Sequence, residues 1–242
     1  MNFKTKSDYY FADNISTQLV LGKKTRFPTL RELYSGALGR FIPNPNLKSE
    51  AAYNIESNWK YLLNNNKFNL SFFYSLLNNG IQRITLPGKQ FKRINKNQIR
   101  TWGIEFSSKI NFIKKINLDF NFSYLHSFSK NNKDEFQDTL EYKPQIISGF
   151  LLNYIVANNL NLDMELNYIG KEFGLQEGSK FYQKLPDYFL LNLRISYNYK
   201  ISKNVNVETF LRVNNLLDKL YFTQWSLPEP GRQFLFGLKL NY

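Results

Sequence analysis

The sequence has no cysteine and a single histidine, His126, among its 242 residues. The absence of cysteine excludes disulfide frameworks, thiol nucleophiles and cysteine-based zinc sites. A single histidine leaves no cluster of imidazole ligands for a metal and little choice of general base. These absences predict a protein without a metal or other cofactor, and they disfavour an enzyme.

Long apolar runs are also missing. The longest, 146–157, is interrupted by polar residues and is shorter than the ~18–20 residues of a membrane-spanning helix. Residues 1–21 lack the continuous apolar stretch of a signal peptide. No segment shows a convincing helical period of 3.6 residues. The sequence therefore disfavours helical membrane proteins and helical bundles.

Alternation of apolar and polar residues is the dominant pattern. In 189–199 every odd position is large and apolar or aromatic, and from Asn192 onward the even positions are polar. A period of two predicts strands with one apolar and one polar face. About ten or eleven strands are expected, each near the ~9–11 residues that cross a bilayer when tilted. Clear or weaker alternation occupies 15–22, 51–61, 67–77, 98–110, 116–124, 143–155, 160–168, 205–213 and 234–242, with a further strand before Asp13-Asn14.

The connections between these strands alternate between short and long. Outer-membrane barrels have this arrangement, with short turns at one end and long loops at the other. The pattern predicts an all-β antiparallel meander that forms part of a transmembrane barrel. The short connections are Asp13-Asn14, 63–66, 112–115, Asn158-Asn159 and 200–204; the long ones are 23–49, 78–97, 128–142, 171–185 and 214–230.

Aromatic residues make up 17% of the chain, and on this meander they group at two levels of the apolar face. Tyr and Trp prefer the headgroup level of a membrane. Two belts support a barrel with lipid outside and water inside; ordinary cross-strand aromatics in a soluble sheet are the alternative. The belt near the short turns is Trp59, Tyr61, Tyr154, Tyr197, Tyr199 and Tyr242, and the belt near the long loops is Tyr74, Tyr124 and Tyr168.

Five motifs, in order along 26–242, resemble the C-terminal half of the barrel of TonB-dependent outer-membrane receptors. Residues 26–34 resemble the F-R-A-P-x-x-x-E-L-Y segment without its alanine, and 44–50 resemble N-P-x-L-K-P-E with serine for the second proline. Asn95 followed by 103–105 is similar to N-x-x-x-x-x-x-G-x-E. Residues 215–221 resemble N-L-x-D-x-x-Y, and 230–232 match P-G-R.

The resemblance implies that the motif residues shape the rim of the barrel. Prolines there mark the chain leaving the sheet, because proline cannot donate to a strand ladder. Gly231 would allow a tight re-entry, and Arg232 would bond loop carbonyls or carboxylates such as Asp218. The rim residues are Arg26, Pro28, Glu32, Tyr34, Asn44, Pro45, Leu47, Glu50, Asn215, Asp218, Tyr221, Pro230, Gly231 and Arg232. The end of the chain resembles the signal read by barrel-assembly machinery, carried by Gly237, Leu240 and Tyr242.

A complete receptor of this family has a signal peptide, a TonB box, a plug domain and roughly twice as many strands. None of these is visible in the sequence. Residues 1–242 are therefore expected to form one incomplete barrel domain. The plug, the N-terminal barrel half and the contact with TonB through the plug would come from elsewhere. The implied location is the outer membrane of a Gram-negative cell.

The chain carries a formal net charge of +13. Basic residues concentrate in 83–100, and on a long loop they could hold lipopolysaccharide phosphates or an anionic small-molecule ligand. The alternative is a solvated loop without a ligand. Nucleic acid is disfavoured because the basic residues show no helix or RNA-binding signature. The ligand-binding candidates are Arg83, Lys89, Lys92, Arg93, Lys96 and Arg100.

A catalytic interpretation would centre on His126, beside Ser127 and Ser129 and before Asp134 and Glu135. Neighbours in sequence rarely form a catalytic triad, so no catalytic residue is assigned. The carboxylates on the polar face are instead expected to pair with basic residues on the same face. The acidic set is Glu56, Glu105, Asp119, Asp163, Glu165 and Glu208, and the basic set is Lys60, Lys109, Arg194, Arg212 and Lys239.

Together these observations favour a barrel for TonB-dependent uptake of a scarce nutrient, such as a ferric siderophore or a cobalamin-like ligand. A passive porin-like or adhesin-like barrel and a soluble glycan-binding β-domain are the alternatives.

Overall fold

The computed structural model describes residues 2–88, 90–130, 136–137, 142–175, 182–202 and 205–241. Eleven strands form one continuous path in the order β1-β2-β4-β5-β6-β7-β9-β10-β13-β14-β17. Every neighbouring pair on this path is antiparallel. The path strands are β1 (Phe3–Ala12), β2 (Ile15–Arg26), β4 (Glu50–Leu63), β5 (Asn66–Leu86), β6 (Gln90–Ile113), β7 (Ile116–Lys130), β9 (Ile146–Ala157), β10 (Leu160–Ile169), β13 (Tyr188–Ser202), β14 (Val205–Asn214) and β17 (Gln233–Asn241).

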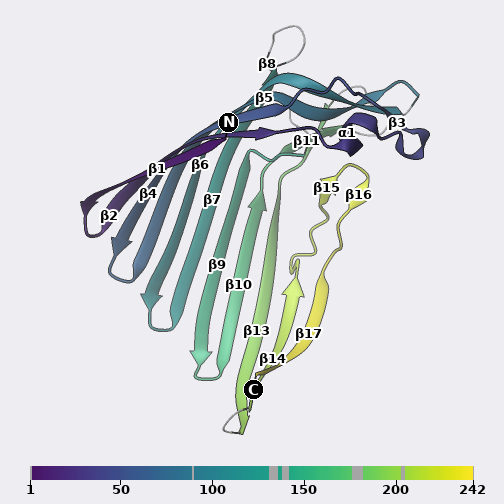
Figure 1. The fold of residues 1–242 in the computed structure, drawn as a ribbon. Helices are drawn as coiled ribbons and strands as arrows, with labels where there is room; N and C mark the ends of the chain where they lie inside the picture. Colours follow the sequence, from purple (N-terminus) through teal and green to yellow (C-terminus); the bar gives the residue numbers. More distant parts are fainter. Residues whose placement is uncertain are drawn as a thin grey trace.

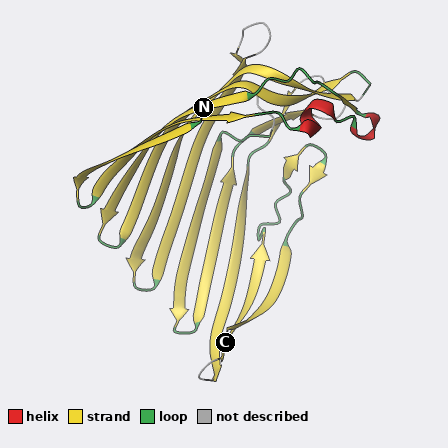
Figure 2. Ribbon diagram, in the orientation of Figure 1, coloured by secondary structure: helices red, strands yellow, loops and turns green. Residues whose placement is uncertain are grey.

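The sheet curves like part of a barrel wall and stays open, since β1 and β17 end the path (Figure 1). This confirms the predicted meander, the expected number of strands and the incomplete barrel. Strand dominates the fold, and helix is confined to one small region of connecting chain (Figure 2). None of the helices in the described part of the chain is long and apolar enough to cross a membrane.

Tight turns and long connections lie at opposite ends of the sheet (Figure 1). At one end the chain turns after β1, β4, β6 and β9; at the other lie the smaller elements. These are α1 (Leu30–Tyr34), the 3₁₀ turn η1 (Ala37–Gly39), β3 (Phe41–Ile42), β8 (Phe136–Gln137), β11 (Glu172–Leu175), β12 (Tyr182–Leu185), β15 (Phe222–Gln224) and β16 (Leu227–Pro228). The predicted segregation of short turns and long loops is confirmed. We refer to the two ends as the short-turn end and the long-loop end.

One expectation for the long connections was wrong. The expected loop 78–97 is a hairpin, because β5 and β6 stay paired out to Leu86 and Gln90. A turn at Pro87-Gly88, where Gly88 has a φ of 80°, closes it tightly enough for pairing to continue. The connection 23–49 contains the helix α1, too short to show a periodic pattern. Its start is fixed by a capping box between Thr29 and Glu32.

Register fixes the two faces of the sheet. Opposed residues share a face, so the row Thr17–Trp59–Leu70–Phe106 lies on one side, and the row Gln18–Asn58–Ser71–Glu105 lies on the other. Apart from Thr17, the first row is apolar, and the second row is polar throughout. We call these the outer and inner faces, since the side with the polar row is the one that a barrel would enclose.

The outer face is not sealed inside the protein. Along β17, Phe234 and Phe236 are 69% and 77% exposed, and along β13 Phe189 and Ile195 are about half exposed. Burial is sparse throughout the described residues, where only Val20, Leu47, Leu185, Tyr188 and Val207 form the buried apolar set. The sheet therefore has no central core and presents its apolar side chains outward, as the predicted barrel requires.

Candidate functional site: the inner wall and the long-loop rim

The inner face of β10, β13 and β14 carries interlocked charges. Arg194 bonds Asp163 at 3.2 Å through one nitrogen and Glu208 through another, and its guanidinium lies over the ring of Phe210. Arg212 lies 3.4 Å from Glu165. These pairs confirm the expected ion pairs for Asp163, Glu165 and Glu208 with Arg194 and Arg212. Of the other residues in that expectation, four form no ion pair among the described residues: Glu56, Glu105, Lys60 and Lys239.

Asparagine side chains donate further hydrogen bonds to two of these carboxylates. Asn153 donates to Asp163 at 2.8 Å, and Asn167 and Asn192 donate to Glu165 at 2.9 and 3.2 Å. The charges on this side are thus satisfied within the wall. We call this region the paired wall; its charged members are Asp163, Glu165, Arg194, Glu208 and Arg212.

The inner face of β5, β6 and β7 differs, because its side chains are small and polar around one carboxylate, Glu105. They surround a shallow depression of about 270 Å³. Farther toward the turns, Lys109 approaches Asp119 at 3.7 Å. We call this region the open wall; it is lined on the inner face by Asn69, Ser71, Glu105, Ser107, Asn121 and Ser123.

Three rim residues named from sequence motifs meet in one ionic cluster. Arg26, at the end of β2, bonds Glu32 of α1 at 2.8 Å and also bonds Glu50 at the start of β4. Glu32 accepts from the backbone of Thr29, and Glu50 accepts from the Ile81 amide on β5. The Arg26 guanidinium lowers the pKa of Glu32 to about 2. The cluster ties the connection 27–49 to three strands; spacing in the sequence did not predict this contact.

The second motif holds the same connection against β6. The Asn44 side chain donates to the Arg93 carbonyl at 2.8 Å. Asn95 accepts from the Lys48 amide at 2.8 Å and donates to the Lys48 carbonyl at 3.0 Å, so one side chain bonds both backbone groups. Leu47 is buried beside them. Through these bonds Asn44 and Asn95 hold the connection 27–49 against β6.

The fourth motif, residues 215–221, closes the turn after β14. Asn215 is buried with a φ of 50°, and its side chain both donates to and accepts from the backbone of Lys219 at 2.9 Å. Asp218 accepts from the backbone amide of Arg232 at 2.8 Å. The expected link between Arg232 and Asp218 is present, through the amide rather than the guanidinium. A β-carbon at Gly231 would lie 2.8 Å from the Asp218 carboxylate, so this approach needs glycine.

Tyr221 of the same motif packs on Tyr188, with ring centroids 4.7 Å apart. Glu172 of β11 lies near Tyr188 and is 8% exposed. Its burial raises the pKa of the carboxyl group. Trp225 donates to the Gln183 carbonyl at 3.4 Å, so the hairpins β11–β12 and β15–β16 contact one another.

The basic ligand candidates are only partly brought together. Arg83 and Arg93 oppose each other across the β5–β6 hairpin. Arg83 lies over the ring of Phe91 at 4.8 Å, and Arg93 lies over Phe41 of β3 at 4.9 Å. Neighbouring positions point to opposite faces, so Lys92 lies on the other side of the hairpin. Arg100 is lower on the outer face, while Lys89 and the side chain of Lys96 lie outside the described residues.

We call the group Phe41, Arg83, Phe91 and Arg93 the arginine arch. The two phenylalanines oppose each other in the parallel pairing of β3 with β6, with ring centroids 5.3 Å apart. Sequence reasoning found the two arginines and missed the phenylalanines, because the residues of β3 that pair with β6 are 50 positions away in the chain. The arch presents two cations on aromatic supports at the long-loop end.

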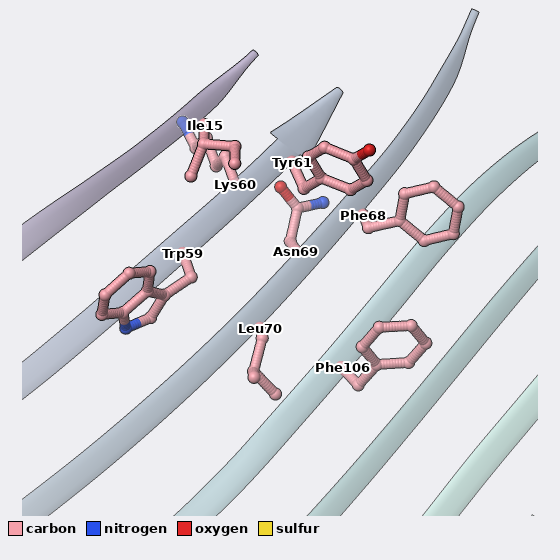
Figure 3. Close-up of a pocket in the computed structure, with 8 residues that line it drawn as sticks. All are labelled: Ile15, Trp59, Lys60, Tyr61, Phe68, Asn69, Leu70 and Phe106. Atoms are coloured by element: carbon pink, nitrogen blue, oxygen red, sulfur yellow. The ribbon is translucent and has the colours of Figure 1, made fainter. Parts of the chain in front are cut away.

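The outer face has an apolar depression of about 210 Å³ near the short-turn end (Figure 3). Trp59 and Tyr61 of β4 border it together with side chains of β2, β5 and β6; Lys60 and Asn69 also contribute. Trp59 stacks on Phe11 and Tyr61 on Phe68. Trp59 and Tyr61 are two members of the aromatic belt expected near the short turns. Another predicted member, Tyr242, lies outside the described residues.

The assembly-signal residues have local roles in β17. Leu240 is 58% exposed on the outer face. Gly237 opposes Phe210 on the inner face, and a β-carbon there would lie 2.2 Å from the ring. Glycine at 237 therefore leaves room for the Phe210 ring, which in turn supports Arg194.

His126 is not placed for catalysis with its neighbouring serines. It lies on the outer face between Trp102 and Phe128, at ring distances of 5.8 and 4.5 Å. Ser127 and Ser129 point to the opposite face by strand parity. Asp134 and Glu135 lie outside the described residues. Among the described side chains there is also no group of three His, Cys, Asp or Glu suited to a metal ion.

An open antiparallel wall with an apolar exterior, a polar interior and all long connections at one end is typical of outer-membrane barrels. The sequence profile of the TonB dependent receptor-like β-barrel family matches residues 3–216. The chain therefore belongs to this family.

Three relatives place the chain within longer proteins. The iron-regulated outer membrane virulence protein of Vibrio cholerae serotype O1 is 23% identical over 238 residues, which cover 90% of this chain and 36% of the relative. The copper transporter OprC superposes with a TM-score of 0.79 at 19% identity, covering 100% of this chain and 39% of that one. The ferric-catecholate import receptor Fiu of K12 E. coli gives 0.76 at 16%, covering 98% and 34%. The chain thus spans well under half of each of them.

Proposed function

We propose that the chain forms part of the wall of an outer-membrane receptor that takes up a scarce nutrient by the TonB-dependent route. The observation that carries this proposal is the combination of an exposed apolar outer face with a polar inner face in a chain of this family. A ferric siderophore or a cobalamin-like molecule is the class of ligand proposed. The relatives named for iron regulation, ferric-catecholate import and copper transport support a metal-containing nutrient.

The arginine arch is the proposed ligand contact. Like charges opposed across a hairpin are unfavourable. The described structure shows no carboxylate paired with Arg83 or Arg93, whereas in the paired wall Arg194 has two carboxylate partners and Arg212 has one. An anionic ligand between the two guanidiniums would relieve their repulsion, and the ring faces of Phe41 and Phe91 would support an aromatic part of the ligand.

Passage of the ligand requires parts that are not in the described structure. A plug domain within the barrel and the remaining strands would complete the lumen, and TonB would act through that plug. Lipid would contact the outer face, including the depression beside Trp59. Lipopolysaccharide would meet the long-loop end, and barrel-assembly machinery would recognise β17. The outer membrane of a Gram-negative cell is the proposed location, and no catalytic activity is proposed.

Ligand binding can be tested on the 242-residue chain in detergent micelles with a ferric tris-catecholate as the probe. Substituting glutamine for both Arg83 and Arg93 should weaken binding about tenfold, because two charge-assisted contacts are lost. The matched control replaces Lys114 and Lys115 in the β6–β7 turn with glutamine, which removes the same charge far from the arch. Equal binding by all three proteins would contradict the arch.

A passive porin is the competing function, and conductance distinguishes it. Purified chain in a planar bilayer should give no steady open channel under the receptor hypothesis, since an open sheet without its complement encloses no pore. Stable channels of uniform conductance together with no saturable ligand binding would favour the porin.

A further inference from the structure

The β11–β12 hairpin has one buried face and one exposed face. Glu172 opposes Leu185 across the hairpin, and Gly174 lies on the same face. Glu172 is 8% exposed, Leu185 is 1% exposed and Gly174 is buried. Lys184 lies on the other face by strand parity and is exposed. The hairpin is therefore packed against other parts of the long-loop end through the face that carries Glu172.

Two other connections contact this hairpin. Tyr142, just before β9, donates its amide to the Phe173 carbonyl of β11 at 2.8 Å. The ring of Tyr142 lies against Gly174, where a β-carbon would come within 2.4 Å of it. Trp225, between β15 and β16, donates to the Gln183 carbonyl of β12 at 3.4 Å. The chain before β9, the hairpin and the chain after β14 therefore meet at one place.

The Glu172 carboxyl group is buried at this meeting point without a partner. Of the described residues, none forms a hydrogen bond or an ion pair with it, and burial alone raises its pKa. Tyr188 lies near Glu172 and packs on Tyr221, with ring centroids 4.7 Å apart. A buried carboxylate without a counter-ion is costly, whereas a neutral carboxylic acid costs much less.

The titratable groups beside the packed face cannot neutralise an ionised Glu172. Glu229, which lies near Tyr188 and Tyr221, is itself acidic. It accepts a hydrogen bond from the Thr223 hydroxyl. Burial and the nearby Glu229 raise the pKa of Tyr221 above its ordinary value of 10, so this hydroxyl is neutral at physiological pH. An ionised Glu172 would therefore meet neutral rings and a second carboxylate.

The nearby basic groups lie on the other face of the hairpin. Lys184 is on the exposed face, opposite to Glu172, and Lys171 lies beside it. Asp187 is also near Lys184 and partly offsets the repulsion between the two lysines. Both lysine side chains are exposed to solvent. In the described structure the packed face of the hairpin thus holds no cation that could pair with Glu172.

We propose that Glu172 is a proton-controlled latch, whose protonated form keeps the β11–β12 hairpin docked on Tyr188 and Trp225 and whose ionised form releases the hairpin. Ionisation places an unpaired negative charge in a buried site, and release returns that charge to water. Acid therefore joins the three connections of the long-loop end. The latch depends on the packing of these residues and not on the arginine arch; its contact with the external medium rests on the proposed function.

The direction of the pH dependence follows from the raised pKa of Glu172 in the docked hairpin. Below the ordinary pKa of 4.5 the group is protonated in both the docked and the released form, and docking is strongest. As the pH rises from there to the raised pKa, the ratio of docked to released hairpin falls about tenfold per pH unit. Release is thus expected on the alkaline side of pH 4.5 and docking on the acid side.

Trp225 is an internal probe of the latch, because its indole contacts the hairpin. Replacing Trp59 and Trp102 with phenylalanine leaves Trp225 as the only tryptophan. Quenching of its fluorescence by acrylamide is measured on the 242-residue chain in detergent micelles between acid and mildly alkaline pH. We expect quenching to increase about twofold as the pH rises, because a released hairpin leaves the indole open to the quencher. The midpoint should lie above pH 4.5.

Substitution of the carboxyl group separates the latch from simple packing. The Glu172→Gln variant keeps the size of the side chain and cannot ionise, so it should show the low quenching of the acid form at every pH. The matched control, Glu229→Gln, removes the other carboxylate beside the tyrosines and should keep the transition. The Glu172→Leu variant supplies a second neutral side chain, which should also abolish the transition if the glutamine variant does not fold.

Three results would overturn the latch. They are quenching that does not change with pH, a transition that persists in Glu172→Gln, and greater quenching in acid than at neutral pH. Loss of the transition in Glu229→Gln, with retention in Glu172→Gln, would assign it to the wrong carboxylate and would overturn the proposal as well. Failure of the arginine arch to bind a ligand would leave the transition unchanged, so the two proposals can fail separately.

Discussion

The paired wall and the open wall are built on the same strand pattern and differ in how their inner faces are satisfied. In the paired wall, Arg194 bonds carboxylates of the two neighbouring strands, and Arg212 reaches Glu165 of β10 across β13. Amides donate to Asp163 and Glu165 as well. In the open wall, short serine and asparagine side chains leave a depression beside Glu105. Alternation alone therefore determines which face of the sheet is polar. The identity of the polar residues determines whether that face is satisfied by its own ion pairs or is available for other contacts.

The largest effect is expected where the paired wall loses its central cation. Replacing Arg194 with methionine keeps much of the side-chain volume but leaves Asp163 and Glu208 without their shared partner. We expect the free energy of unfolding to fall by about 2–3 kcal/mol, below the range for fully buried pairs because the Arg194 side chain is 27% exposed. Urea unfolding in detergent micelles measures this change.

The control for this prediction also replaces Asp163 with asparagine and Glu208 with glutamine. Removing all three charges should recover at least half of the loss, because no unpaired carboxylate remains. A loss that persists unchanged in the triple variant would assign the effect to packing on Phe210 instead.

A somewhat smaller effect is expected from filling the space under Phe210. Leucine at position 237 would force the ring away from its site, and overpacking of this kind costs about 1–3 kcal/mol. The same unfolding measurement applies. Replacing Phe210 with alanine in the leucine variant should restore part of the stability; if it lowers stability further, the ring is not the source of the cost.

The rim cluster provides a test by pH rather than by stability. The pKa of Glu32 is lowered to about 2 by Arg26, so the stabilisation from this carboxylate is present above its ordinary pKa of 4.5 and is lost as the pH falls through about 2. Titration of the Glu32 side-chain carbon by NMR should give that midpoint. Replacing Arg26 with glutamine should move it toward 4.5, and a midpoint already near 4.5 in the unaltered chain would exclude the cluster.

The smallest effect is expected in the open wall. Replacing Glu105 with glutamine should change the free energy of unfolding by less than about 0.5 kcal/mol, because the side chain is exposed and has no ion-pair partner among the described residues. A loss comparable to that of the Arg194 variant would erase the contrast between the two walls.

Much of this architecture can be predicted from the sequence, because the two-residue period of a strand is visible within a short segment. Alternation in 189–199 and 234–242 is enough to assign the exposed outer face, and the short turns follow from residues such as Asp13-Asn14. The motifs also drew attention to Arg26, Asn95 and Asn215, whose side chains bond the connecting chain at the long-loop end. Lys92 and Arg93 show that a cluster of basic residues in the sequence need not form one site. Adjacent residues of a strand point to opposite faces, so this cluster is divided between the two faces.

The contacts that sequence could not supply depend on distant segments meeting. The arginine arch needs β3 to lie beside β6, and the rim cluster needs Glu32 and Glu50 to converge on Arg26. The sequence predicts a loop at 78–97 because its basic and amide residues obscure the alternation of a strand. Pro87-Gly88 is the one local signal for the turn of the hairpin.

The most direct test of the barrel account is a spin-label scan of β13 in liposomes, with one cysteine at each position from 189 to 199. The account predicts that labels at odd positions collide mainly with dissolved oxygen, which concentrates in lipid, and that labels at even positions collide mainly with a water-soluble nickel chelate. Loss of that alternation, or its inversion, would contradict an apolar exterior and an aqueous interior.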